Sequence, residues 1–505
     1  MRLVVVTGIL SLFLGRVTLA ALTVDASSDR PFVPLRVPLA RIGAILPRQA
    51  SEIASSHWML NCTPYDRHFG EYRQHKDYIG PLGIKKFRLL AGWARCEQIA
   101  GEYDFSWLDE IVDDLMSKGI ATTLETDYGN PIYPGGGGSD LAGGFPSSEE
   151  ALSAWDRWVE ALARHFSGRV RDWAMWNEPD LRNPAVPAGE PSRRTPAEIA
   201  IFNVRTARII KRIIPSASIG ALSLASTRPD FFEDCVRELK EAGGEGLFSH
   251  IIYHGYTFAP ESAYANVESN KLIVAKWFPG LYVRQGENGC PSELTTRFAL
   301  PGYCWSEYSQ AKWDLRRMLG DLGHDVDSTV FSVADFNHIG REINRKGLLR
   351  ANADNDVVSI KRAYYAVQNC VSVFDEDLLR VVDPGITNVD VTVQTYEYRT
   401  TAGHAVYAFW KAGEPELHGK GKARYCTVKY VPPGDSFETA PTVFDIFRGP
   451  PMADPVWVDL VSGGVYALGP NRQVVHSRGF SLVDIPCYDS PCLVCERVAL
   501  KGKMR

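Results

Sequence analysis

Long basic runs and, beyond the N-terminus, long apolar runs are both absent from this sequence of 505 residues. The formal net charge is −5, and Lys and Arg do not cluster, which argues against an electrostatic nucleic-acid binder. After the first stretch of the chain, no apolar segment is long enough to cross a bilayer. We therefore expect no nucleic-acid partner and no stable membrane insertion once the N-terminus has been processed.

Motifs for nucleotide and metal cofactors are also missing. The glycine-rich segment 134–144 lacks the Gly-Lys-Ser/Thr ending of a phosphate-binding loop, and no dinucleotide-binding turn follows the first predicted strand. Cys487, Cys492 and Cys495 form a C-x4-C-x2-C cluster, but no second CxxC or His-x3-His follows it. We expect no cofactor and no metal site, and interpret 134–144 as a loop at a barrel mouth or a connector.

The N-terminus is predicted to be a secretory signal peptide. Arg2 supplies the positive charge, Leu3 to Gly15 is apolar but short, and Thr18-Leu19-Ala20 resembles a cleavage site. An uncleaved anchor is the alternative. Export would make the protein secreted or periplasmic and would permit disulfides, so we expect one or two among the ten cysteines, with the other thiols buried.

Eight short apolar runs alternate with amphipathic segments and predict a (β/α)8 barrel. Helical periodicity is clearest at 105–119, 147–168, 195–215 and 359–374. The doubly wound sheet is the alternative, but it lacks its expected glycine-rich turn. The predicted strands lie at 57–63, 84–90, 120–127, 172–178, 218–224, 249–256, 280–287 and 328–336.

The pattern changes beyond about residue 380. Short alternating runs are separated there by Gly, Pro and Asp turns, which predicts an antiparallel β-sandwich. The fold class is therefore α/β, a (β/α)8 barrel followed by a C-terminal sandwich. The predicted boundaries are 1–20 for the signal peptide, 21–55 for an N-terminal linker or arm, 56–378 for the barrel and 379–505 for the sandwich domain.

Polar residues at the carboxyl ends of barrel strands are the candidates for chemistry, because that face carries the active site in this fold. Glu178 and Glu287 end the fourth and seventh strands and would face each other across the mouth. Cleaving a glycosidic bond with retention needs two carboxyl groups about 5–5.5 Å apart, one protonated and one ionised. Glu293 and Glu307 follow in the next loop and are alternative partners for Glu178.

Three motifs resemble the retaining (β/α)8 glycoside hydrolases of clan A. They are Trp-Asn-Glu-Pro at 176–179, an apolar strand that ends in Glu287, and His254-x-Tyr256. The segment GxYDFxWLD (101–109) and the β domain after the barrel most resemble glycoside hydrolase family 39 and its relatives. The resemblance covers roughly residues 56–500.

The resemblance implies a role for each matching residue. Glu178 would be the general acid/base and Glu287 the nucleophile, while Asn177 would bind the sugar 2-hydroxyl. Arg88 would steady the nucleophile, and His254 and Tyr256 would belong to the site, with Tyr256 able to hydrogen-bond Glu287. From position alone, Arg88 could be a buried ion-pair residue and His254 a core histidine. Further substrate-binding candidates, each of which could equally be structural, are Tyr128, Asp127, Trp93, Trp305, Tyr133 and Asp335.

The sequence thus predicts a retaining β-glycoside hydrolase that acts on an oligo- or polysaccharide through a covalent glycosyl-enzyme. Long loops after the third, fourth and seventh strands would wall the mouth into a pocket, which favours exo action. The alternatives are a transglycosylase on the same site and a non-catalytic carbohydrate-binding barrel.

Overall fold

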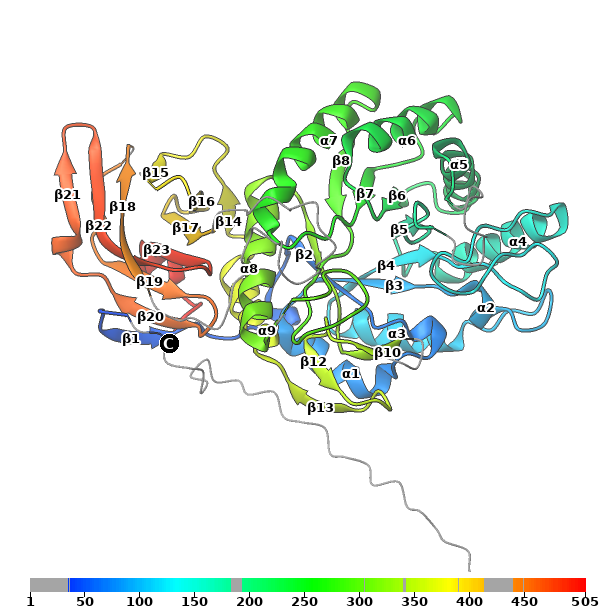
Figure 1. Ribbon diagram of the computed structural model, residues 1–505, viewed down its shortest axis with the longest axis horizontal. Coiled ribbons are helices and arrows are strands. Elements are labelled where there is room, and N and C mark those ends of the chain that lie inside the picture. Colours follow the sequence, from blue (N-terminus) through cyan, green and yellow to red (C-terminus); the bar gives the residue numbers. More distant parts are fainter. Residues whose placement is uncertain are drawn as a thin grey trace, which may run out of the picture.

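The computed structural model describes residues 35, 37–182, 193–303, 305–338, 342–388, 390–412, 439–447 and 449–505. The predicted signal peptide and the apolar run at 423–431 lie outside these residues. The described chain forms a barrel of strands ringed by helices and, beside it, a two-sheet β-sandwich (Figure 1). Within the described residues, no helix combines the length and the apolar character that a membrane span requires.

The barrel is an eight-stranded parallel sheet in the order β8-β7-β6-β5-β4-β3-β2-β9. Two parallel bridges, Arg284 with Asp327 and Asn288 with Val330, join its two end strands and close the ring. Each strand lies within one of the eight predicted apolar runs, which confirms the predicted fold class. The strands are β2 (Trp58–Asn61), β3 (Lys86–Leu90), β4 (Ala121–Thr126), β5 (Asp172–Met175), β6 (Ser218–Leu224), β7 (His250–Tyr253), β8 (Tyr282–Gln285) and β9 (Ser328–Val330).

Amphipathic helices cover the outside of the barrel (Figure 1). In α4 the Ser148 side chain caps the first turn, and the buried face carries Trp155 and Trp158. In α5 Thr195 and Glu198 form a capping box before an apolar face. The helices are α1 (Tyr72–Ile79), α2 (Trp93–Cys96), α3 (Ser106–Ser117), α4 (Glu149–Phe166), α5 (Pro196–Ile213), α6 (Pro229–Glu241), α7 (Tyr264–Trp277), α8 (Glu307–Gly323) and α9 (Arg362–Val373).

Two small hairpins follow the last barrel strand. The predicted eighth strand extended to residue 336, but β9 ends at Val330 and the chain turns into short antiparallel pairs. This insertion between β9 and α9 brings Phe336, Asn344 and Lys346 to the mouth of the barrel. The hairpins are β10 (Phe336–His338) with β11 (Glu342–Asn344), and β12 (Leu349–Ala351) with β13 (Val357–Ile360).

The sandwich consists of two antiparallel sheets, in the orders β1-β20-β19-β23-β17-β16-β14 and β15-β18-β22-β21. Its first edge strand comes from the predicted N-terminal arm, since β1 pairs with β20. The strands are β1 (Arg41–Ala44), β14 (Leu378–Arg380), β15 (Ile386–Asn388), β16 (Val393–Thr400), β17 (Ala405–Lys411), β18 (Ala440–Ile446), β19 (Pro455–Asp459), β20 (Gly464–Ala467), β21 (Gln473–His476), β22 (Gly479–Cys487) and β23 (Cys492–Glu496).

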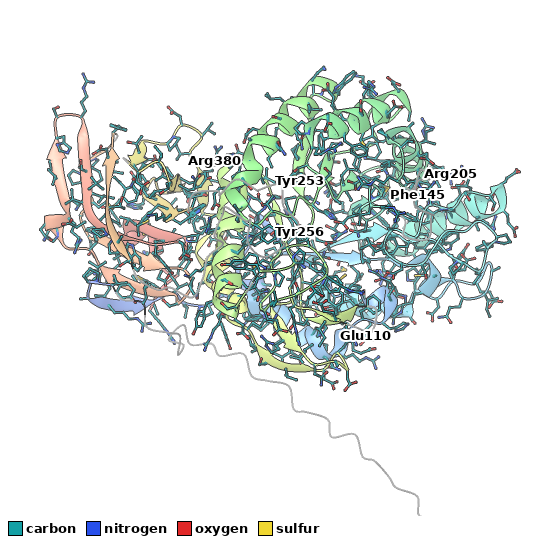
Figure 2. All side chains as sticks on the ribbon, in the orientation of Figure 1. Glu110, Phe145, Arg205, Tyr253, Tyr256 and Arg380 are labelled. Carbon is teal, nitrogen blue, oxygen red and sulfur yellow. The ribbon has the colours of Figure 1, made fainter. Side chains whose placement is uncertain are left out.

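One hydrophobic core extends from the barrel into the sandwich, and a second core lies within the sandwich. Phe374, just after α9, packs edge-on against Tyr398 of β16 at a ring distance of 4.9 Å, and the buried Asn369 donates to the carbonyl of Leu460. The eight cysteines that the structure describes are all buried free thiols, so the expected disulfides are not found among them. In the view of Figure 2, Tyr256 lies toward the middle of the molecule, whereas Glu110 and Arg205 lie toward the end remote from the sandwich.

Candidate active site

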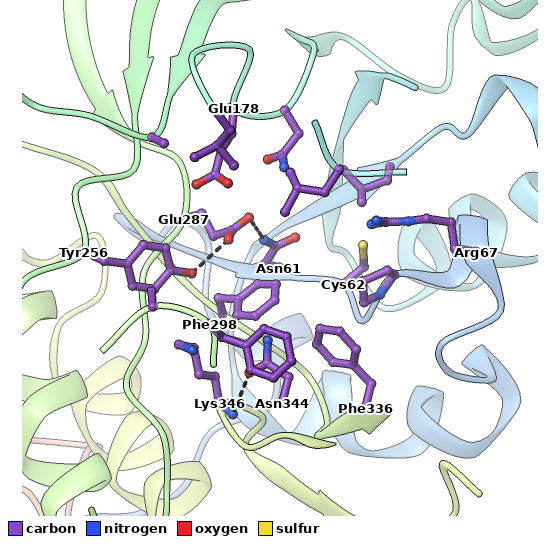
Figure 3. A pocket seen from close by; sticks show the side chains of 18 of the residues that line it. Asn61, Cys62, Arg67, Glu178, Tyr256, Glu287, Phe298, Phe336, Asn344 and Lys346 are labelled. Atoms are coloured by element: carbon purple, nitrogen blue, oxygen red, sulfur yellow. Dashed lines mark hydrogen bonds between the residues drawn. The ribbon is translucent and has the colours of Figure 1, made fainter. Parts of the chain in front are cut away.

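Glu178 and Glu287 meet at the carboxyl ends of the barrel strands, as the sequence predicts. A carboxylate oxygen of each and a ring nitrogen of His254 all lie within 4.8 Å of one another. Both carboxyl groups line a cavity of about 400 Å³ at the barrel mouth (Figure 3). Glu293 and Glu307, the alternative partners, instead form ion pairs with Arg345 and Arg350.

The backbone that presents Glu178 is held in an uncommon conformation. Trp176 and Glu178 have φ values of 50° and 49°, a left-handed region that side chains other than glycine rarely adopt. The Glu178 N–H donates to the carbonyl of Ser223 on β6, at 3.0 Å. Asp180 fixes the next turn, because its two carboxylate oxygens accept from the N–H groups of Ala225 and Ser226. The motif therefore serves as a rigid turn that aims Glu178 across the mouth.

Glu287 follows β8 directly and is surrounded by donors. A Cβ on the preceding Gly286 would lie 2.3 Å from Ile252 Cγ2, so only glycine permits this close approach to β7. Tyr256 Oη donates to Glu287 Oε1 at 2.8 Å. Glu287 Oε2 accepts from Arg88 at 2.7 Å and from Asn61 Nδ2 at 3.1 Å. Both oxygens are thus fixed by hydrogen bonds.

Arg88 on β3 lies beneath this pair and is almost fully buried. Its guanidinium makes a two-pronged ion pair with Glu125 of β4, at 2.7 and 2.8 Å, and also reaches Glu287 and the Asn177 side-chain oxygen. Asn177 in turn donates to Tyr128 Oη at 2.8 Å. Arg88 is therefore both a buried ion-pair residue and a hydrogen-bond donor to Glu287.

Truncating Arg88 should cost a large part of the stability of the barrel. We expect Arg88→Met to lower the free energy of unfolding in urea by about 3–5 kcal/mol, because it leaves Glu125 buried and unpaired. The matched control is Arg73→Met, which removes a two-pronged ion pair with Glu110 on the exposed surface and should change stability by less than about 1 kcal/mol. Equal losses in the two variants would contradict the assigned role of Arg88.

The two carboxyl groups have opposite protonation tendencies. Burial raises the pKa of Glu178 above its ordinary value, and the charge of Glu287 adds to the rise, although the His254 hydrogen bond opposes it. Burial would also raise the pKa of Glu287, but the charges of His254 and Arg88 and the hydrogen bonds from Arg88 and Tyr256 outweigh it and hold this pKa low. Glu178 is thus suited to carry a proton and Glu287 to be ionised.

The His254 side chain contacts Glu178 and does not line the cavity. Its ring is fully buried, and Nδ1 lies 2.9 Å from Glu178 Oε1, while Nε2 has no partner among the described residues. Burial disfavours the charged ring, yet the hydrogen bond to Glu178 and the charge of Glu287 raise the pKa of His254. The hydrogen bond therefore links the protonation of His254 to that of Glu178.

Several predicted binding residues do not reach the cavity. Trp93 is fully buried in an aromatic cluster with Trp155, Trp158 and Tyr133, at ring distances of 5.5, 6.0 and 5.6 Å. Trp305 stacks on Phe258 and is 4% exposed, so neither tryptophan offers a free face to a sugar. Two buried carboxyl groups also lie outside the cavity lining, those of Asp127 and Asp335, and the latter pairs with Lys361.

The cavity is also lined by residues that the sequence analysis did not identify as substrate ligands. Asn61 was visible at a strand end, and it proves to hydrogen-bond Glu287. The remaining side chains come from loops and hairpins whose paths no local pattern reveals, and they include Arg67, Leu141, Phe298, Phe336, Asn344 and Lys346.

A cation would have to compete with the donors already in place. Within the part of the chain that the structure describes, Glu178, His254 and Glu287 are the group whose spacing could hold a metal ion. The Glu287 oxygens already accept from Arg88, Asn61 and Tyr256, and His254 Nδ1 is engaged by Glu178. The guanidinium also supplies positive charge where a cation would sit, so this donor set fits a carboxyl pair better than a metal site.

The comparisons with known proteins point to one fold. A family model described as beta-galactosidase, of the glycoside hydrolase 42 family, matches residues 77–132, and no curated protein matches the chain. A family 39 glycoside hydrolase from Bacteroides cellulosilyticus superposes with a TM-score of 0.59 at 14% identity, over 90% of this chain and 83% of that chain. A β-xylosidase from Caulobacter crescentus superposes with a TM-score of 0.53 at 14% identity, over 90% of this chain and 98% of that chain. The catalytic domain of a family 30 xylanase from Talaromyces cellulolyticus superposes with a TM-score of 0.54 at 12% identity, over 90% of this chain and 98% of that chain.

The chain therefore has the barrel-and-sandwich fold of clan A glycoside hydrolases. The predicted resemblance to family 39 is confirmed at the level of the fold by the family 39 enzyme.

Proposed function

We propose that this protein is a retaining β-glycoside hydrolase, with Glu287 as nucleophile and Glu178 as general acid/base. The observation that carries the proposal is the carboxyl pair, whose oxygens lie within 4.8 Å and whose pKa values are moved in opposite directions. Inverting enzymes need about 6.5–9.5 Å between the carboxyl groups to admit a water, so the short separation supports retention.

In the first step, an oxygen of Glu287 attacks the anomeric carbon while the bond to the leaving oxygen breaks. Glu178 transfers its proton to that oxygen, and the sugar becomes an ester of Glu287. Arg88 and Asn61 hold Oε2, which leaves Oε1, with the single neutral donor Tyr256, as the more nucleophilic atom. Asn177 faces the cavity and would bind the sugar 2-hydroxyl.

In the second step, water replaces the departed group. Glu178, now ionised, takes a proton from the water as its oxygen attacks the anomeric carbon, and the ester bond to Glu287 breaks. His254 lies against Glu178 throughout and can accept part of the proton. The sugar leaves with its original anomeric configuration, and both carboxyl groups return to their starting states.

The cavity supports action on chain ends. Its wall includes Leu141 from the glycine-rich loop, Phe298 from the loop after β8, and Asn344 from the hairpin after β9. These segments stand on several sides of a cavity of about 400 Å³, which supports a pocket that takes a chain end. We propose exo action on an oligo- or polysaccharide, by a protein that is secreted or periplasmic.

A panel of aryl β-glycosides tests the proposal. The panel comprises xyloside, glucoside, galactoside, mannoside and glucuronide, and the first-formed product is followed by proton NMR. We expect at least one substrate to be cleaved with the β-anomer of the free sugar appearing first. If the α-anomer appeared first, the retaining mechanism would be contradicted. If the protein cleaved neither the panel nor any polysaccharide, the proposal that it is a glycoside hydrolase would be contradicted. If the sugar were transferred to an added sugar acceptor in place of water, the protein would be a transglycosylase. If it bound an oligosaccharide without turnover, it would be a non-catalytic carbohydrate-binding barrel.

Removing the Tyr256 hydroxyl should shift the pH dependence of the reaction. Burial raises the pKa of Tyr256 well above its ordinary value, so this residue stays a neutral donor to Glu287. In Tyr256→Phe the low pKa of Glu287 rises, because one stabilising hydrogen bond to the carboxylate is lost. The acid limb of the kcat/KM profile should therefore move to higher pH, with a loss of about tenfold at the optimum. An unmoved acid limb would contradict the assignment of that limb to Glu287.

A further inference from the structure

Lys346 is a buried cation in the cavity wall, and the described residues offer its ammonium group no acidic partner. It is 2% exposed and lines the same cavity as Glu178 and Glu287. No hydrogen bond or ion pair to its ammonium group is found within the described residues. Two aromatic rings lie near the ammonium group, Tyr256 at 5.8 Å and Phe298 at 5.7 Å from Nζ.

The other buried cations near the site are all paired. Arg88 is neutralised by Glu125 and Glu287, and Arg67 by Asp66 at 3.0 Å and Asp140 at 2.5 Å. An ammonium group taken out of water without a partner is costly, because the loss of hydration is not repaid. Burial accordingly lowers the pKa of Lys346 to about 8, although the charges of Glu287 and Glu178 oppose the change.

A second unused donor lies beside Lys346. The side-chain oxygen of Asn344 accepts a hydrogen bond from the backbone N–H of Lys346 at 3.3 Å, so the NH2 group of the same side chain is not used in this contact. Within the described residues no partner is found for the Asn344 amide NH2 group, and Asn344 also lines the cavity. In Figure 3 the two side chains lie together beneath Glu287 and Tyr256, with Phe298 at their side.

Together these groups form a site for an anion on the substrate. Lys346 offers charge, Asn344 offers a neutral donor, and the rings of Tyr256 and Phe298 lie near the ammonium. We propose that the sugar bound against Glu287 carries an acidic group, a carboxylate or a sulfate ester, which Lys346 and Asn344 bind. This inference rests on the proposed function and names the substrate class of that site.

Matched pairs of aryl β-glycosides test the inference, because the two members of a pair differ in one group. The pairs are glucuronide with glucoside, galacturonide with galactoside, and glucoside 6-sulfate with glucoside. For at least one acidic member we expect a kcat/KM at least about tenfold above that of its neutral partner. The arm that shows the preference tells whether the acidic group is a carboxylate or a sulfate.

Variants assign the preference to the two residues. Lys346→Met should lower kcat/KM on the acidic sugar about 10- to 100-fold and change the neutral one less than about threefold. Asn344→Ala should lower kcat/KM on the acidic sugar several-fold. Lys346→Arg should keep the preference for the acidic sugar, and it tests the role of the charge even if Lys346→Met folds poorly. Lys276→Met removes a lysine paired with Glu233 on the surface and should change nothing.

Two results would overturn the inference. One is a wild-type enzyme that cleaves neutral glycosides, the xyloside among them, as well as any acidic sugar or better. The other is an equal loss in Lys346→Met on both members of a pair, since Lys346 would then be a counter-charge for Glu287. Either result leaves cleavage of glycosides intact, whereas a protein that cleaves no member of any pair or of the wider panel fails the proposed function itself.

Discussion

Glu287→Gln is expected to lower kcat on any substrate of this protein by about 10⁴-fold or more, with the fold retained. The amide keeps the size of the side chain, and its oxygen can still accept from Arg88 and Asn61, while its NH2 group can donate to the Tyr256 hydroxyl oxygen, but it cannot form the ester intermediate. The loss should appear in kcat and in kcat/KM together, because the interaction is made with the reacting carbon. Steady-state kinetics, with circular dichroism and urea unfolding as folding checks, measure it.

The loop after β8 provides matched controls for this substitution. Glu293→Gln and Glu307→Gln change carboxylates that follow in the same stretch of sequence but that pair with Arg345 and Arg350. We expect each control to keep kcat within about threefold of the wild type, since changes away from the reacting atoms have small effects. A greater loss in either control than in Glu287→Gln would transfer the role of nucleophile to that residue.

Glu178→Ala should have the second-largest effect, and its size should depend on the leaving group. General acid catalysis contributes about 10²–10⁴-fold, so glycosides with poorly acidic leaving groups should lose that much in kcat/KM. A dinitrophenyl glycoside needs little protonation and should lose far less in its first step. Its glycosyl-enzyme should then accumulate, because no base activates the water.

Azide completes the test of Glu178. A small anion can enter the space left by the carboxylate and attack the ester without a general base, so azide should restore turnover of the dinitrophenyl substrate and yield a β-glycosyl azide. The control is Asp180→Asn, which changes a neighbouring carboxylate in the same turn, the acceptor of the Ala225 and Ser226 N–H groups, and keeps Glu178 itself. If the loss in Glu178→Ala were the same for every leaving group, or azide had no effect, Glu178 would not be the acid/base.

The barrel could be predicted because its strands are buried on both faces. Such strands are continuous apolar runs, and each of the eight observed strands falls within a predicted one. The N-terminal strand β1 was not predicted as a strand, because Arg41–Ala44 is short and lies at a sheet edge, where pairing with the distant β20 decides its conformation. Tertiary contact, and not local pattern, creates this element.

The meeting of the two carboxyl groups could also be predicted, since Glu178 and Glu287 stand at strand ends whose positions the barrel determines. Trp93 and Trp305 illustrate the limit of this reasoning. Each lies near a strand end or mouth loop in sequence, yet each turns into an aromatic cluster that buries both ring faces. Lys346 shows the opposite case, because nothing local marks it, and it reaches the cavity only through the hairpin after β9.

Trapping the covalent intermediate is the most direct measurement of the carboxyl pair. A 2-deoxy-2-fluoro glycoside of the preferred sugar, with a good leaving group, slows the second step and should leave the sugar attached to the protein. Peptide mass spectrometry of the wild-type protein should then place one sugar on Glu287 and none on Glu178, and Glu287→Gln should take up no label. A label on Glu178 or Glu293, or rapid turnover that gives the α-anomer with no label at all, would contradict the account.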